Sequence, residues 1–250
     1  MPRKERTVVL VNDFAAGRRM ADTFRRLEHR LRAVVGEFEL RFTDRPGHAT
    51  ALTRDALRDG ATRLLVGGGD GTIHEVVNGW LDAKGRPLNP KARLGFLPGG
   101  VGGDLRRSLG LGTLDRCLDA LAADHVRTLD VGRAMVSDGV SGALDPRFFV
   151  NVASFGLSAR AIRQRGMLTH LGGAGAYAAA TARALVGWHN VPVRLDFDGR
   201  LASRRVATVA IANGRYFGAG MKIAPDALLD DGRLSVTVIG DLGPLSLLGL

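Results

Sequence analysis

Three scarcities limit the classes of protein to which this sequence can belong. Cys117 is its one cysteine, so no disulfide can form within the chain, and such usage is typical of a reducing cytosol. Aromatic residues make up 6% of the chain, and no basic block is interleaved with them, which argues against a nucleic-acid-binding protein. No stretch reaches the roughly 20 apolar residues that a membrane-spanning helix needs. Any contact with a membrane is therefore expected to be peripheral.

Positive charge, by contrast, is abundant. The 250 residues carry a formal net charge of +10 at pH 7. Such a surface favours an anionic partner, namely nucleic acid, anionic lipid or a phosphorylated ligand, although many of the arginines can serve solubility alone. The hydrophobic fraction, 45%, is ordinary for a soluble globular protein, and the length allows one large core or two modest ones.

The most informative stretch runs from Leu64 to Gly79 and reads LLVGGGDGTIHEVVNG. A short apolar run typical of a buried strand comes first, then a glycine turn, and a helical pattern begins at Thr72. This arrangement binds phosphate, because glycines let the backbone approach and the first helical amides point at the anion. Asp70 lies within the turn, and a bare carboxylate would repel phosphate, so a bridging divalent cation is expected. A tight turn in an ordinary α/β protein is the alternative.

A second stretch has the same organisation. Residues 94–97 are a strand candidate, residues 98–103 are a glycine-rich turn, and a helical pattern starts at Asp104 and stops at Gly110. In a parallel sheet both turns would leave the carboxyl ends of their strands, where open α/β sheets bind ligands. Two such turns, each with an acid, predict a nucleotide-binding crevice.

The remaining patterns divide the chain into two halves. In the first half, strands and helices alternate, which predicts a doubly wound parallel sheet. The second half is rich in β-branched and alternating runs, with a hairpin signal at Asp198-Gly199 and one helical region over 158–186. We predict a nucleotide-binding domain over residues 1–128 and a β-rich domain over residues 129–250. The predicted strands are 7–11, 38–42, 126–136, 147–154, 191–197, 201–213 and 234–239, and the other predicted helices are 20–36, 49–59 and 113–123, with Gly36 and Gly60 as stops.

Several motifs in a fixed order carry a family resemblance. They are the stretch GGDGTIHEVVNG at 68–79, the turn LPGGVGGDLRR at 97–107, and ANGRYFGAGM, APDA and DDGRL between 212 and 234. Together they resemble the diacylglycerol kinase catalytic family, which also includes sphingoid-base kinases and bacterial lipid kinases. The resemblance implies an α/β nucleotide domain similar to that of phosphofructokinases, followed by a β-sandwich that helps bind lipid. It also implies transfer of the γ-phosphate of ATP to a lipid hydroxyl, with Mg²⁺, by a cytoplasmic protein at the inner membrane face that serves phospholipid synthesis.

The resemblance also assigns roles to single residues. Asp70 is the expected catalytic residue and metal ligand, and Asn12, Gly17 and Thr43 match family positions that contact the nucleotide, although turn or cap roles are open for Asn12 and Thr43. The resemblance also implies a structural cation before the last predicted strand. Its expected ligands are the Asp231 side chain and the main chain of Leu228 and Arg233. A plain Asp-Gly turn is the alternative. The full set of expected nucleotide contacts is Asn12, Gly17, Thr43, Gly68, Gly69, Asp70, Gly71, Thr72, Glu75, Gly100, Gly102 and Asp104.

The sequence departs from the family pattern near the phosphate site. Val101 replaces a threonine, Gly103 replaces an asparagine, and Asp13 replaces a proline and adds negative charge. Each change is expected to lower nucleotide affinity, because losing one hydrogen bond typically costs ~1 kcal/mol.

A further departure concerns the general base. Family members carry an Asp-Gly-Glu-type motif beyond the last predicted strand, and no position in this sequence matches it. Either the sequence is a fragment, or the protein lacks the usual base and is slow, uses Asp70 instead, or is a catalytically inactive nucleotide- or lipid-binding homologue. An NAD kinase is a weaker alternative. NAD kinases share the GGDGT turn, but their pattern has an Asn-Glu pair where this sequence has Asn78-Gly79.

The acceptor lipid is only partly constrained. Ser158 stands where relatives often have an acid, which disfavours an amine headgroup such as a sphingoid base and leaves a diacylglycerol-like lipid. Arg160, Arg163 and Arg165 follow, and they could face anionic lipid or form a solvated helix face.

Overall fold

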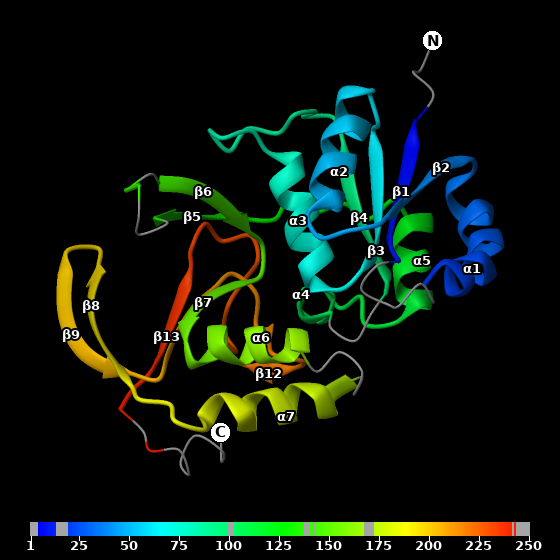
Figure 1. Cartoon of the computed structure of the whole chain (residues 1–250). Coiled ribbons are helices and arrows are strands. Elements are labelled where there is room, and N and C mark those ends of the chain that lie inside the picture. Colours follow the sequence, from blue (N-terminus) through cyan, green and yellow to red (C-terminus); the bar gives the residue numbers. More distant parts are fainter. Residues whose placement is uncertain are drawn as a thin grey trace. The chain divides into compact units, whose positions relative to one another are not determined.

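The chain folds into two compact units, residues 1–150 and 151–250, in the computed structural model (Figure 1). The structure describes residues 5–13, 20–99, 103–137, 141–142, 144–167, 173–241 and 243. The hairpin at 132–149, which follows the boundary predicted from the sequence, lies by its contacts within the first unit. Each unit is described in turn.

A parallel four-stranded sheet forms the centre of the first unit. Val8 to Val11 and Leu64 to Val66 are fully buried, which explains why these strands read as continuous apolar runs: helices cover the parallel sheet on both faces. The strand order is β2-β1-β3-β4, and the bounds are Thr7–Asn12 for β1, Phe38–Thr43 for β2, Arg63–Gly68 for β3 and Arg93–Pro98 for β4.

Helices lie on both faces of this sheet (Figure 1). On one face, Phe24 and Leu31 of α1 and Leu118 of α5 pack against Val9 and Leu65 of the strands. On the other face, α2 and α3 pack against each other and contact β1 and β3. The first unit is therefore an α/β sandwich of three layers, as the alternating pattern predicted. The helices are α1 (Met20–Val35), α2 (His48–Arg58), α3 (Asp70–Trp80), α4 (Asp104–Ser108) and α5 (Leu114–Ala122).

The strand order creates a switch point between β1 and β3. From β1 the chain crosses to β2 on one side, whereas from β3 it crosses to β4 on the other. The carboxyl ends of β1 and β3 lie side by side there, at Asn12 and Gly68, because the two strands are parallel and paired through Val11 and Gly67. Open α/β sheets bind ligands in the crevice at such a point.

A β-hairpin completes the first unit. It consists of β5 (Gly132–Ser137) and β6 (Leu144–Phe149), and it is fixed to α3 by the Asn78 side chain. The amide of Asn78 donates to the Phe148 carbonyl oxygen at 2.9 Å and accepts from the Phe148 N–H at 3.0 Å. The predicted strand over 126–136 is wrong at its start, since residues 126–131 are not in a strand.

The second unit contains a three-stranded antiparallel sheet in the order β13-β10-β7. Two helices, α6 and α7, pack together through Leu157, Ala161, Ala184 and Leu185, so the single predicted helical region is two helices. The bounds are β7 (Val152–Gly156), α6 (Leu157–Met167), α7 (Gly173–Leu185), β8 (Val191–Phe197), β9 (Arg200–Val206), β10 (Thr208–Ala212), β11 (Tyr216–Phe217), β12 (Met221–Lys222) and β13 (Ser235–Ile239).

Two long predicted strands are broken in the structure. The run 147–154 is divided between β6, which pairs with β5, and β7, which pairs with β10; at the start of β7 the Asn151 carbonyl oxygen accepts from the Asn213 and Gly214 amides. The run 201–213 is divided between β9 and β10 at Ala207, whose N–H donates to Ile239 and whose carbonyl oxygen accepts from Leu157. None of the helices in the described part of the chain is long and apolar enough to cross a membrane.

Candidate functional site

Three residues predicted to contact a ligand meet at the switch point. The Thr43 hydroxyl donates to Asn12 Oδ1 at 3.1 Å, and Asn12 Nδ2 donates to Thr72 Oγ1 at 2.6 Å. Thr43 and Thr72 are buried and Asn12 is half-buried. The ends of β1 and β2 and the start of α3 are thus joined by a directed chain of hydrogen bonds.

The surroundings of Gly68 and Gly71 in the first turn differ in whether they leave room for a side chain. A Cβ on Gly68 would lie 2.5 Å from Thr72 Oγ1, so a side chain there would displace the threonine from the hydrogen-bond chain. A Cβ on Gly71 would meet no heavy atom of the described chain within 4 Å. Packing therefore explains Gly68, whereas the structure gives no packing reason for Gly71.

The carboxylate of Asp70 links the two glycine turns. Its Oδ2 accepts from the amides of Gly103, at 2.9 Å, and Asp104, at 3.0 Å, and its Oδ1 accepts from the Leu105 amide at 3.1 Å. These amides lie at the start of α4 and have no hydrogen-bond partner within that helix, so Asp70 caps a helix that lies after the next strand. A carboxylate has about four acceptor positions, and three are used here.

Asp104 is buried beside this link. Its carboxylate accepts from the Arg107 guanidinium at 2.5 Å, one turn further along α4. The second turn brings Asp104 next to Asp70 through its backbone amide, and the ligand contact of Asp104 stays a prediction.

Glu75 has a capping role that the sequence did not suggest. Its two carboxylate oxygens accept from the amides of Gly47, at 2.9 Å, and Ala49, at 3.1 Å, at the start of α2. The N-cap position of α2 is Gly47, which has no side chain to cap with, and no acid lies in the first turn. That missing cap is the one signal that could have indicated an acceptor elsewhere in the chain.

His74 lies on α3 close to these groups. Desolvation, and then the positive charge of Arg147, lower the pKa of His74 below its ordinary value, while Glu75 opposes the shift. Neutral imidazole is therefore favoured at this position near neutral pH.

The predicted cation site lies in the turn before β13. Leu228, Asp231 and Arg233 are all exposed, and Asp231 Oδ1 accepts from the Arg233 amide at 3.1 Å, which is an Asx-type turn. Among the residues that the structure describes, no group of three or more His, Cys, Asp and Glu could hold a metal ion. Cation binding through these residues stays a prediction.

The comparisons with known proteins agree with this geometry. Residues 6–134 match the family described as diacylglycerol kinase catalytic domain, and residues 151–250 match the YegS C-terminal NAD kinase beta sandwich-like domain. The chain belongs to the diacylglycerol kinase catalytic domain family. The first unit of this family member is the α/β domain with a parallel sheet, and its second domain is β-sandwich-like, as predicted.

Two bacterial proteins are similar to this chain over most of its length. A diacylglycerol kinase of Staphylococcus carnosus (strain TM300) is 28% identical over 79% of this chain and 60% of the relative. A protein of Chromohalobacter salexigens named "Probable lipid kinase YegS-like" is 31% identical over 84% of this chain and 64% of the relative. The chain thus spans less than two thirds of the length of these relatives. A crystal structure of a diacylglycerol kinase from Bacillus anthracis str. Sterne superimposes with a TM-score of 0.68 at 22% identity, covering 98% of this chain and 77% of that one.

Some expected contacts lie outside the described residues. These are Gly17 of the first loop and Gly100 and Gly102 of the second glycine turn, together with the departure at Val101. The structure brings together Asn12, Thr43, Gly68 and Thr72 at the switch point, and it places Asp70 beside Asp104. Which of these contact a ligand stays a prediction.

Proposed function

We propose that this protein is a lipid kinase that transfers the γ-phosphate of ATP to the hydroxyl of a diacylglycerol-like lipid, with Mg²⁺, on the cytoplasmic face of a membrane. Family membership supports a kinase, and the hydrogen-bond chain at the switch point supports the place where phosphate binds. The observation that carries the proposal is the joining of Asn12, Thr43 and Thr72 beside a glycine turn.

The direction of that chain suits phosphate binding. Thr43 donates to the amide oxygen of Asn12, and the amide nitrogen of Asn12 donates to Thr72. Because Thr72 Oγ1 accepts this hydrogen bond, its own hydroxyl hydrogen is available to donate to a phosphate oxygen. The first amides of α3 lie at the same place and add the positive end of a helix dipole.

Asp70 has two roles in the proposal. It positions the second glycine turn by capping α4, and its remaining acceptor position would contribute to a Mg²⁺ ion. This fits magnesium, which is usually held by one or two carboxylates together with substrate phosphates. When bound, the ion would neutralise charge on the phosphates, and phosphoryl transfer depends on such neutralisation and positioning more than on covalent chemistry. We assign no residue of this chain as the base for the acceptor hydroxyl.

Incubation with radiolabelled ATP and mixed micelles of diacylglycerol tests the proposal. We expect labelled lipid from the wild type and much less from Thr72→Val, because the variant keeps its size but loses the hydroxyl donor. Absence of labelled lipid together with absence of ATP binding in calorimetry would overturn the proposal. ATP binding without turnover would show a nucleotide-binding homologue instead, and labelling of NAD in place of lipid would show an NAD kinase.

A further inference from the structure

The short loop between β2 and α2 lies at the sheet edge that carries the proposed phosphate site. It consists of residues 44–47 and leaves the carboxyl end of β2. Open α/β sheets bind ligands at the carboxyl ends of their strands. The residue just before this loop, Thr43, is already part of the hydrogen-bond chain at the switch point. The loop therefore continues the proposed phosphate site along the edge, over the end of β2.

Both ends of this loop are tied to the beginning of α3. At its start, Thr43 is joined through Asn12 to Thr72. At its end, the Gly47 amide donates to Glu75 at 2.9 Å, and Glu75 lies three residues, or about 4.5 Å along the helix axis, after Thr72. Two ties to the same helix place the residues between them beside the start of α3.

The loop between these ties has little freedom to change shape. Pro46 has a restricted φ, and the His48 amide donates to the Arg45 carbonyl oxygen at 3.3 Å, which closes a β-turn. A loop that is already ordered loses little conformational entropy when a ligand binds. The side chains of this loop are thus well placed to recognise a ligand at the edge.

The carboxylate of Asp44 is oriented by two neighbours. Its Oδ1 lies 2.7 Å from His48 Nδ1 and 2.8 Å from Arg45 Nη1. Among the residues that the structure describes, none makes a hydrogen bond or ion pair with Asp44 Oδ2, and the side chain is 64% exposed. Because a carboxylate has about four acceptor positions, Asp44 presents an oriented oxygen that can accept hydrogen bonds from a ligand.

The charge of Asp44 decides which part of a nucleotide it suits. A carboxylate repels phosphate, and a single guanidinium, that of Arg45, offsets this charge only in part. The ribose of ATP is uncharged, is joined directly to the phosphates and carries two neighbouring hydroxyl donors. In dinucleotide-binding α/β folds, a carboxylate near the phosphate site accepts hydrogen bonds from such hydroxyl groups. Ribose is therefore the part of ATP that fits Asp44.

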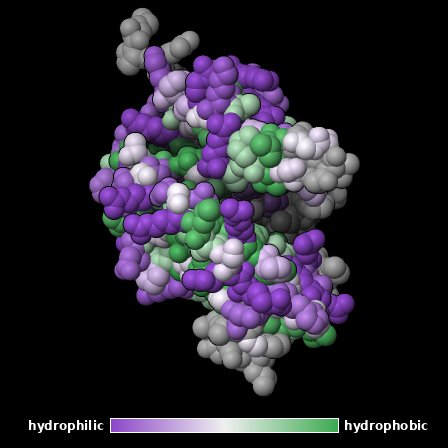
Figure 2. Space-filling model, turned by 90° about the vertical axis from the view of Figure 1, so that its left-hand side faces the viewer, coloured by the Kyte–Doolittle hydropathy of each residue, from purple (hydrophilic) through white to green (hydrophobic). Residues whose placement is uncertain are grey.

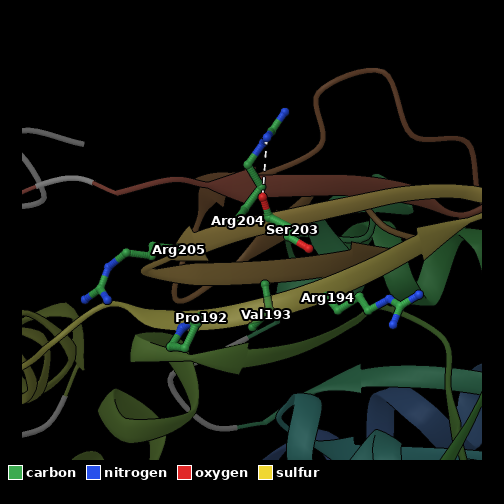
Figure 3. Close-up of a pocket in the computed structure, with 6 residues that line it drawn as sticks. All are labelled: Pro192, Val193, Arg194, Ser203, Arg204 and Arg205. Carbon is green, nitrogen blue, oxygen red and sulfur yellow. Dashed lines mark hydrogen bonds between the residues drawn. The ribbon is translucent and has the colours of Figure 1, made fainter.

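The open cavity on the hairpin β8–β9 is a weaker ligand site. Arg194, Arg204 and Arg205 line it, but Figure 3 shows their guanidinium groups pointing in three different directions. Strand pairing also puts Arg204 on the opposite face of the hairpin from Arg194 and Arg205. Figure 2 shows a surface where small hydrophobic patches lie among hydrophilic residues, which is ordinary for a folded protein. These arginines do not converge on one ligand, whereas the loop at Asp44 is built around one carboxylate.

We propose that Asp44 binds the ribose hydroxyl groups of ATP and so makes this protein selective for ribonucleotides. The inference rests on the proposed function, which puts the triphosphate at Thr72. The phosphates would then lie at the ends of β1 and β3, and the ribose would lie over the end of β2. Through their contacts with Oδ1, Arg45 and His48 are positioning residues for the carboxylate.

Calorimetry with ATP, 2′-deoxy-ATP and 3′-deoxy-ATP in the presence of Mg²⁺ tests this proposal. We expect the wild type to bind ATP roughly tenfold more tightly than either analogue, the lower end for a hydrogen bond to a charged group because Asp44 is exposed. Asp44→Ala should bind all three nucleotides with equal affinity. The control Asp55→Ala removes the same charge from an exposed position of α2 and should keep the tenfold preference.

The preference is a ratio measured on one protein, so partial unfolding of a variant does not change it. Equal binding of ATP and both analogues by the wild type would overturn the inference, as would a preference that persists in Asp44→Ala. Loss in Asp44→Ala of selectivity for ATP over ITP, with ribose selectivity kept, would assign Asp44 to the base instead. Failure of the wild type to bind ATP at all would overturn the proposed function and this inference together, whereas ATP binding without a ribose preference overturns the inference alone.

Discussion

At the scale of the residue, Asp70 and Glu75 show how one helix organises its neighbours. Both project from α3, and each caps another helix: Asp70 caps α4 and Glu75 caps α2. A helix start has amides without internal partners, and a carboxylate satisfies several of them while favouring the positive end of the dipole. Asp70 thus fixes the second glycine turn and Glu75 fixes the start of α2, and both acids belong to the same helix.

The first prediction concerns Asp70→Asn. The asparagine keeps one acceptor oxygen, but its NH₂ group cannot accept, so at least one amide at the start of α4 loses its partner. We expect a loss of about 1–2 kcal/mol in the free energy of unfolding by urea, and weaker ATP binding as well. Asp119→Asn, at an exposed position of α5, is the control. Equal stability of the two variants would show that the caps at Gly103 to Leu105 contribute nothing.

Gly71→Ala separates folding from ligand binding. A methyl group there meets no atom of the described chain within 4 Å, and alanine favours a helix over glycine by about 0.5–1 kcal/mol. We therefore expect a protein that is equally or more stable in thermal melts but binds ATP several-fold more weakly, because the phosphate can no longer approach the backbone. Unchanged ATP affinity would show that the phosphate does not bind at this turn.

His74 gives a pH dependence with a definite sign. Its pKa in the folded state is lowered by desolvation and by Arg147, so below about pH 6.5 the unfolded chain takes up the proton first. Stability is therefore expected to fall as the pH drops from 7 toward 5, and His74→Gln should lose less over this range than the wild type. His125→Gln, at an exposed position, is the matched control in urea melts at each pH. Parallel pH profiles of wild type and His74→Gln would contradict the assignment.

At the scale of the element, the contact between α2 and α3 depends on one glycine. A Cβ on Gly79 would overlap the Thr50 carbonyl oxygen and lie 2.8 Å from the Thr53 Cβ. Gly79 also follows Asn78, whose side chain holds β6. The Asn-Gly pair that departs from the NAD kinase pattern therefore has two packing roles in this fold.

Gly79→Ala is expected to push α2 and α3 apart. Overpacking of this kind typically lowers the free energy of unfolding by about 1–3 kcal/mol, and here the helix propensity of alanine offsets only part of it. Gly112→Ala, where a Cβ meets open space, is the control. Equal urea midpoints for the two variants would show that the helices can separate without cost.

Local signals predicted most of the elements of the first unit. Helices end at Gly36, Gly60 and Gly110, all with positive φ, as the sequence indicated. The caps from Asp70 and Glu75 could not be predicted, since they join positions far apart in the chain. The breaks at Asn151 and Ala207 were missed for the same reason, because the backbone groups of these residues bond to Asn213 and Ile239, which lie far away in the sequence.

At the scale of the whole molecule, the strand order decides where chemistry can occur. The order β2-β1-β3-β4 puts the ends of β1, β3 and β4 at one edge, and so the two loops that the sequence selected by glycine content, which follow β3 and β4, meet there. The sequence predicted the edge but not the partners within it, since the hydrogen-bond chain from Thr43 to Thr72 depends on the register between strands. Membership of the diacylglycerol kinase catalytic domain family agrees with this arrangement.

A crystal structure with a non-hydrolysable ATP analogue and Mg²⁺ tests the central claim most directly. The triphosphate is expected within hydrogen-bond distance of Thr72 Oγ1 and of the backbone at Gly71, with the second glycine turn still held by Asp70. An analogue found away from the ends of β1 and β3, or no analogue at concentrations that saturate kinases, would contradict the account.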